Sequence, residues 1–254
     1  MTYKLLNVNT NAKTVKNAKL NYLTGVLYLA PADLSGYNVC PMAELAQCKD
    51  PCLNTAGRGK FNNVQLARIR KTKWFFEDRQ GFMMQLVKDI ERLVKQADKK
   101  GMTPLVRLNG TSDIKWENVR FDYEFAFGKV RTPTLFQLFP EVQFYDYTKI
   151  NSRNDKTKNP HFPANYDLTF SYSGVAGFKK HVDIAMKSGI RVAVVFDSKA
   201  KVQDYVRSGA KFLDMLVVDG DDTDVRHEDS QGVVVGLYAK GSAKHDTSGF
   251  VVRS

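Results

Sequence analysis

The stretch Asn38–Gly59 reads NVCPMAELAQCKDPCLNTAGRG and contains every cysteine of the chain, Cys40, Cys48 and Cys52. Seven residues separate the first two cysteines and three separate the last two. A disulfide would use two thiols and leave one over, and the residues before this stretch have no apolar segment typical of a signal peptide. In a reducing compartment, such a group of thiols is typical of a metal site or of catalysis. We call Asn38–Gly59 the cysteine segment.

Three interpretations of these thiols are open. In the first, three thiolates bind three irons of a [4Fe-4S] cluster, and the fourth iron stays open for a substrate or an external ligand. In the second, the thiols bind zinc together with a distant fourth ligand, because structural zinc sites normally have four protein ligands. No histidine lies close in sequence, since the four are His161, His181, His227 and His245. In the third, the thiols are structural or redox-active. The absence of a nearby fourth ligand favours the iron–sulfur cluster.

Composition and charge limit the class of protein. The 254 residues are 43% hydrophobic, which is enough for one substantial core, and we expect a single domain over residues 1–254 with an irregular lead-in over 1–21. The net charge of +11 indicates a polyanionic partner, with nucleic acid as the first candidate. Apolar runs such as Val192–Phe196 are too short to span a bilayer, so we expect no membrane partner and a cytoplasmic protein.

Short apolar strands alternate with helical stretches along most of the chain. In the helix predicted over Phe82–Lys99, apolar residues recur at i, i+4, i+8, i+11 and i+15. The other predicted helices are Phe61–Arg79, Val175–Ser188 and Ala200–Ser208. The predicted strands are Leu23–Ala30, Thr103–Leu108, Val142–Tyr147, Asp167–Tyr172, Arg191–Phe196, Leu213–Val218 and Val233–Tyr238. This alternation predicts an α/β fold, a complete or partial (β/α) TIM-like barrel, with the cysteine segment in the loop after the first strong strand.

Polar residues lie at the carboxyl ends of several predicted strands, where barrel enzymes hold their chemistry. We expect five of them to orient a cofactor or substrate: Asn109, Ser112, Asp113, Ser171 and Asp197. Each could instead cap a helix or start a turn.

Two charged features in and after the strands need separate explanations. Arg107 lies inside a strand and is expected either to face an edge or to form a salt bridge. Asp219–Asp229 lacks the spacing of a Ca²⁺ loop, and we expect it to be a solvated acidic loop.

A run of basic residues follows the thiols. Between Gly57 and Lys73 the sequence has six lysines or arginines and no acid. We expect four of them to contact the phosphates of a nucleic acid: Arg58, Lys60, Arg68 and Arg70.

The motifs Cys40-Pro-x6-Cys48-x3-Cys52-Leu, Gly57-Arg-Gly, Ala67-Arg68 and Leu108-Asn-Gly-Thr-Ser-Asp together resemble those of the phage "gene product 88" family. The resemblance continues through Gly-Leu-Tyr-Ala-Lys-Gly and Ser-Gly-Phe-Val near the C-terminus, so it covers nearly the whole chain from about Thr24. It implies a phage protein, which would act in the cytoplasm of the host cell.

The layout also resembles, more distantly, the radical S-adenosylmethionine enzymes. These place three cysteines after the first strand of a partial barrel, hold a [4Fe-4S] cluster and bind S-adenosylmethionine at the open iron. Their cysteines are usually separated by three and then two residues, whereas here the separations are seven and three. Two hypotheses follow: an iron–sulfur enzyme acting on a polyanionic substrate, or a non-catalytic metal-binding protein that binds nucleic acid or a host partner.

Overall fold

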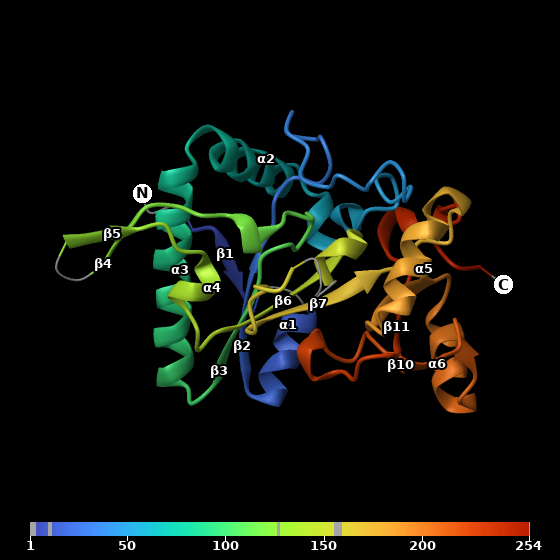
Figure 1. The fold of residues 1–254 in the computed structure, drawn as a ribbon. Helices are drawn as coiled ribbons and strands as arrows, with labels where there is room; N and C mark the ends of the chain where they lie inside the picture. Colours follow the sequence, from blue (N-terminus) through green and yellow to red (C-terminus); the bar gives the residue numbers. More distant parts are fainter. Residues whose placement is uncertain (1–3, 10–11, 126–127, 155–158, 254) are drawn as a thin grey trace.

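The chain folds around one nine-stranded sheet (Figure 1), seen in a computed structural model that describes residues 4–9, 12–125, 128–154 and 159–253. The strand order is β1-β2-β3-β6-β7-β8-β11-β10-β9. The seven inner strands run parallel, and antiparallel β1 (Leu6–Val8) and β9 (Lys211–Phe212) form the two edges. The parallel strands are β2 (Tyr22–Leu27), β3 (Thr103–Arg107), β6 (Gln143–Thr148), β7 (Tyr166–Ser171), β8 (Val192–Phe196), β10 (Met215–Asp219) and β11 (Val234–Tyr238). A separate hairpin, β4 (Tyr123–Phe125) with β5 (Lys129–Arg131), projects from the body.

The predicted α/β class and the mostly parallel sheet are confirmed, but a closed barrel is not found. Within the described residues no ladder joins β1 to β9, and β11 inserts between β8 and β10 instead of following β10 at the edge. The edge strands span only three and two residues, so each offers few backbone groups for pairing. The sheet is therefore a curved, open one.

Helices α2 (Asn62–Glu77) and α3 (Arg79–Lys99) cover one part of the sheet, and α5 (Lys179–Lys187) and α6 (Lys199–Ser208) cover another (Figure 1). The apolar face predicted for α3 is fully buried in the larger core, together with residues of β2, β3, β6 and β7. The helix begins three residues earlier than predicted because the Asp78 carboxylate accepts the Gly81 N–H at 2.9 Å and caps it. Residues 4–21 contain β1 and the short helix α1 (Ala12–Asn17).

The segment after β10 is not the solvated acidic loop that was expected. Asp221 and Asp224 are buried, with 9% and 3% of their surface exposed. The Asp224 carboxylate pairs with Arg107 of β3 at 3.1 Å and accepts the Tyr145 hydroxyl at 2.8 Å. Asp221 pairs with Lys13 of α1 and with Lys240. The salt-bridged alternative for Arg107 is correct, and its need for a counter-charge explains why this acidic segment folds inward.

Across the described residues, we find no helix with the length and apolar character needed to cross a membrane.

Candidate metal centre

The cysteine segment lies between β2 and α2, so it follows the second strand of the chain, the first of the parallel set. The spacer between Cys40 and Cys48 forms a series of turns. The Ala43 N–H donates to the Cys40 carbonyl, and the Cys48 N–H donates to the Ala43 carbonyl, both at 3.0 Å. Gln47 has a φ of 48° and ends these turns. The first two thiols are thus connected by a compact, hydrogen-bonded link.

All three cysteines are free thiols of intermediate exposure. Burial raises the pKa of each thiol, to about 12 for Cys40, and a neighbouring thiol adds to the rise for Cys40 and Cys52. The thiols therefore lie within electrostatic range of one another. Ionising them in this environment requires compensating positive charge, such as a bound metal provides.

In the described part of the chain, no three His, Cys, Asp or Glu side chains converge closely enough to hold one metal ion. A single zinc with Zn–S bonds near 2.3 Å would need thiolates about 3.8 Å apart. A cubane cluster instead bonds each thiolate to a different iron, and its thiolates stand further apart. The thiol arrangement that a single ion requires therefore differs from the one that a cluster requires.

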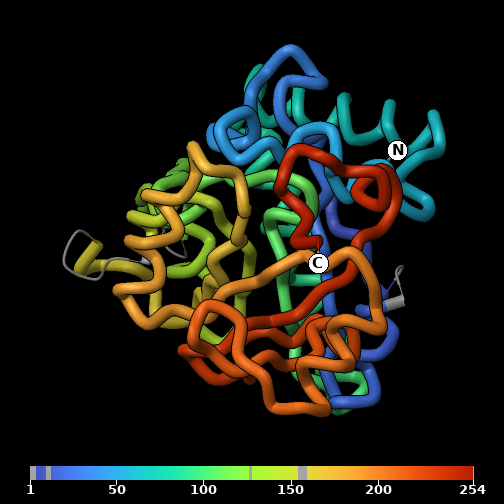
Figure 2. Tube along the Cα trace, turned by 90° about the vertical axis from the view of Figure 1, so that its right-hand side faces the viewer, coloured from blue at the N-terminus to red at the C-terminus, as the bar shows by residue number. Residues whose placement is uncertain are grey.

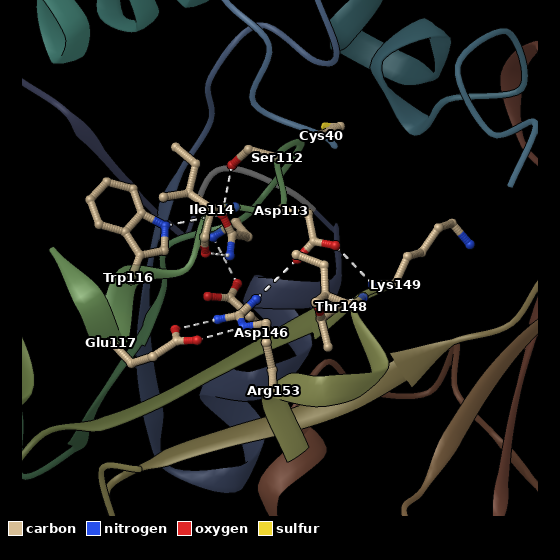
Figure 3. Close-up of polar contacts among 12 residues, drawn as sticks. Cys40, Ser112, Asp113, Ile114, Trp116, Glu117, Asp146, Thr148, Lys149 and Arg153 are labelled. Atoms are coloured by element: carbon tan, nitrogen blue, oxygen red, sulfur yellow. Dashed lines mark hydrogen bonds and ion pairs between the residues drawn. The ribbon is translucent and has the colours of Figure 1, made fainter. Parts of the chain in front are cut away.

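The Asn109–Asp113 loop after β3 lies beside Cys40, whose sulfur is 3.8 Å from the Thr111 carbonyl oxygen (Figure 3). Asn109 is buried, and its amide oxygen accepts from Ser112 Oγ at 2.8 Å, Ile114 N at 3.0 Å and Trp116 Nε1 at 3.0 Å. Asn109 and Ser112, two predicted cofactor contacts, therefore hold the loop itself.

Asp113, also predicted to contact a cofactor, connects the cysteine segment to the strand ends. Its backbone N–H donates to the Val39 carbonyl at 2.8 Å, next to Cys40. One carboxylate oxygen pairs with Arg153 at 3.0 Å, and the other accepts the Lys149 backbone N–H at 2.8 Å (Figure 3). Burial raises the pKa of Asp113, while Arg153 opposes the rise. Arg153 also pairs with Glu117 at 2.7 Å, so this arginine is balanced by two carboxylates.

Lys149, directly after β6, is a buried cation that the sequence reading did not single out. Its Nζ donates to Ser171 O and Ser171 Oγ at 3.1 Å and to Tyr172 O at 3.0 Å. The Nζ also lies over the rings of Phe178 and Phe250, at 5.4 and 4.8 Å from their centroids. Among the described residues it forms no ion pair. Burial lowers the pKa of Lys149, and the nearby Cys48 and Asp113 oppose this lowering. The signal in the sequence was the polar end of β6, where Lys149 follows Thr148.

Arg68 is a second buried cation near the thiols. Its guanidinium hydrogen-bonds the Asn54 side chain and lies 4.9 Å from the Tyr28 ring centroid. The Asn54 backbone N–H donates to the Cys52 sulfur at 3.5 Å, so Asn54 connects Arg68 to this thiol. The Arg68 Nε is buried and has no hydrogen-bond partner among the residues that the structure describes.

The predicted nucleic-acid residues divide into two groups. Arg58, Lys60 and Arg70 are exposed, whereas Arg68 keeps only 8% of its surface and does not belong to the outer face of α2. Lys73 is exposed further along the helix. Arg68 and Arg70 are two residues apart on α2 and therefore point to different sides of the helix, whereas Arg58 and Lys60 precede it.

The remaining predicted residues, Ser171 and Asp197, lie at the ends of β7 and β8. Ser171 anchors Lys149, as described above, so the structure connects it to the thiol site through that lysine. Asp197 donates its backbone N–H to the Val252 carbonyl at 3.1 Å and is joined to the C-terminal segment, residues 240–252.

The C-terminal segment lies beside the cysteine segment (Figure 2). Ser242 Oγ donates to the Asp50 carbonyl at 2.6 Å, and the Ser242 N–H donates to Thr55 Oγ1 at 3.1 Å. Gly241 has a φ of 59°, and a Cβ there would come within 2.6 Å of Thr55 Oγ1. Phe250 belongs to a small core against which Cys48 packs. The two sequence motifs near the C-terminus thus fix the cysteine segment from a second side.

Taken together, the fold is that of an α/β protein with a largely parallel sheet and three free thiols past the carboxyl end of β2. A family model described as Gene product 88 matches residues 4–254, and the chain belongs to this phage family. Neither the curated proteins nor the solved structures contain a match.

Proposed function

We propose that this protein binds a [4Fe-4S] cluster through Cys40, Cys48 and Cys52 and carries out radical or redox chemistry on a polyanionic substrate, with nucleic acid as the first candidate. The observation that carries the proposal is the environment of the thiols. They lie within electrostatic range of one another, at the carboxyl-terminal end of a parallel strand, with the buried cations Lys149 and Arg68 nearby. A thiolate-ligated cluster is an anionic group that suits such a place.

The residues present fit a cluster with three protein ligands. The three cysteines would hold it, and when bound it would supply an open iron for a ligand and one-electron chemistry. The chain's own contribution is a fixed frame. Asp113 ties the segment next to Cys40 to Arg153, and Ser173 Oγ donates to the Ala46 carbonyl at 2.8 Å close to Cys48. Such a frame places ligands before the cofactor arrives.

The radical-enzyme part of the proposal is supported by the strand order. From β2 to β8 the parallel strands follow one another in chain order, as in a partial (β/α) barrel, and the thiols follow the first of them. S-adenosylmethionine is the external ligand that this layout implies. Substrate phosphates would meet the exposed cations Arg58, Lys60 and Arg70.

Anaerobic purification tests the cluster. We expect brown protein with a broad absorption near ~400 nm, lost in Cys48→Ser and kept in the matched control Met42→Leu from the same segment. Colourless protein with one stoichiometric zinc would contradict the proposal and support the zinc alternative.

Incubation of the reconstituted protein with S-adenosylmethionine and dithionite tests the chemistry. Formation of 5′-deoxyadenosine is the result expected of a radical enzyme, with Cys48→Ser as the blank. A cluster that leaves S-adenosylmethionine intact would instead favour the second candidate, a non-catalytic metal-binding phage protein that binds nucleic acid or a host partner. One observation favours that candidate: the side chains of Asn109 and Ser112 form hydrogen bonds within their own loop.

A further inference from the structure

Two buried side chains near the thiols carry positive charge that no carboxylate in the described residues pairs with. Lys149 and Arg68 are each only 8% exposed, and neither forms an ion pair in that part of the chain. Burying an isolated charge is costly, and proteins normally pair it or place it beside a bound ion. In the proposed function these two cations only lie near the thiols, and what their charges do for a bound cluster is not yet explained.

The two cations approach the site from different elements. Lys149 Nζ lies over Phe178 and Phe250, and Cys48 packs against the two apolar clusters that contain these rings. Arg68 reaches Asn54, whose N–H donates to the Cys52 sulfur. One cation is therefore placed near Cys48 and the other near Cys52.

Their hydrogen bonds separate two roles. An ammonium group has three N–H donors, and Lys149 uses three on Ser171 O, Ser171 Oγ and Tyr172 O. It can act on the site only through its charge. Arg68 has a buried Nε that finds no hydrogen-bond partner in the described part of the chain, so one N–H donor is left for a sulfur atom beside Cys52.

Asp113 is a competing anion, because it lies close enough to Lys149 to raise the pKa of that lysine. The Asp113 carboxylate already pairs with Arg153 at 3.0 Å and accepts the Lys149 backbone N–H. Asp113 is thus engaged by other groups, and positive charge remains on the thiol side.

We propose that Arg68 and Lys149 are positioning residues whose buried charges stabilise the reduced form of a thiolate-ligated cluster and raise its reduction potential. This inference rests on the proposed cluster. Reduction adds one electron, here supplied by dithionite, and so one negative charge to the cluster. Nearby buried cations stabilise that extra charge most where water is excluded.

A redox titration of the cluster, followed by absorption and electron paramagnetic resonance, tests this role. In Arg68→Met and Lys149→Met we expect the ratio of reduced to oxidised cluster at a fixed potential to fall about tenfold. Arg70→Met is the matched control, because it removes an exposed arginine from the same helix, and it should leave the ratio unchanged. Arg68→Lys keeps the charge and should keep most of the effect.

The outcomes separate the two proposals. A brown parent protein whose ratio is the same in Arg68→Met, Lys149→Met and Arg70→Met would overturn the charge role and leave the cluster standing. A colourless parent would overturn both. If Arg68→Met stays folded but loses the cluster while Arg68→Lys retains it, the need for positive charge at this position is supported. The effect of charge on the reduction potential is then measured in Lys149→Met alone.

Discussion

Buried charges occur in two regions of this molecule, and the regions differ in how the charges are balanced. Among the strands, Arg107 pairs with Asp224, and Arg153 pairs with both Asp113 and Glu117. Around the thiols, Lys149 and Arg68 are buried to a similar degree, yet neither has a carboxylate partner within the described residues. Balanced charges are what a fold needs to hold its elements together. A buried cation without a partner indicates a place prepared for an anion.

The largest expected effect comes from breaking a balanced group. Arg153→Met would leave the buried Asp113 and the partly buried Glu117 without their cation, and we expect a loss of about 3–5 kcal/mol in the free energy of unfolding. Urea denaturation followed by circular dichroism measures it. Arg207→Met, which removes an exposed arginine paired with Asp204, is the control and should change stability by less than about 1 kcal/mol. Equal losses in both variants would contradict the distinction between buried and exposed pairs.

Asp146 lies between the two cases, because it is fully buried but only distantly paired, 3.9 Å from Arg107 Nε. Burial raises its pKa to about 7, and Arg107 opposes the rise. From its unfolded value of about 4 up to about 7, the unfolded chain releases this proton while the folded chain keeps it. Stability therefore falls as pH rises through this window and levels off above it.

The matching variant is Asp146→Asn, which cannot ionise. Measured from about pH 4 to about pH 8, the parent should lose roughly 4 kcal/mol relative to Asp146→Asn. Parallel pH profiles for the two proteins would mean that Asp146 is ionised in the folded state throughout, as a fully paired carboxylate would be.

The sequence was sufficient for the features set by local periodicity and insufficient for those set by distant pairing. The apolar repeat of α3 and the short apolar strands follow from what each stretch must bury. Asp224 and Arg107 are 117 residues apart, and no local pattern connects them. For the same reason the acidic stretch was misread as solvated. At the candidate site the thiols were visible in the sequence, whereas Lys149, the inward turn of Arg68 and the C-terminal segment become visible only in the assembled sheet.

Exposed cations form a third case, in which water already balances the charge. Arg58→Ala combined with Arg70→Ala should weaken binding to any nucleic acid about tenfold, for every sequence alike, and reduce the salt dependence. Fluorescence anisotropy with labelled single- and double-stranded oligonucleotides measures it. Lys95→Ala with Lys99→Ala removes the same charge from an exposed face of α3 and serves as the control. If both double variants bind alike, Arg58 and Arg70 belong only to a solvated surface.

The smallest expected effect is the sharpest test of the comparison, and it needs no metal. In metal-free protein, Lys149→Met replaces an unpaired buried charge with an apolar side chain of similar length that can pack against Phe178 and Phe250. Removing such a charge relieves its desolvation cost, which offsets the loss of three hydrogen bonds. We expect the free energy of unfolding to change by no more than about 1 kcal/mol, against the several lost in Arg153→Met. A loss as large as that of Arg153→Met would show that Asp113 serves Lys149 as a full partner. The thiol side would then be as balanced as the inner strands, and the case for an anionic group at the cysteines would lose its physical basis.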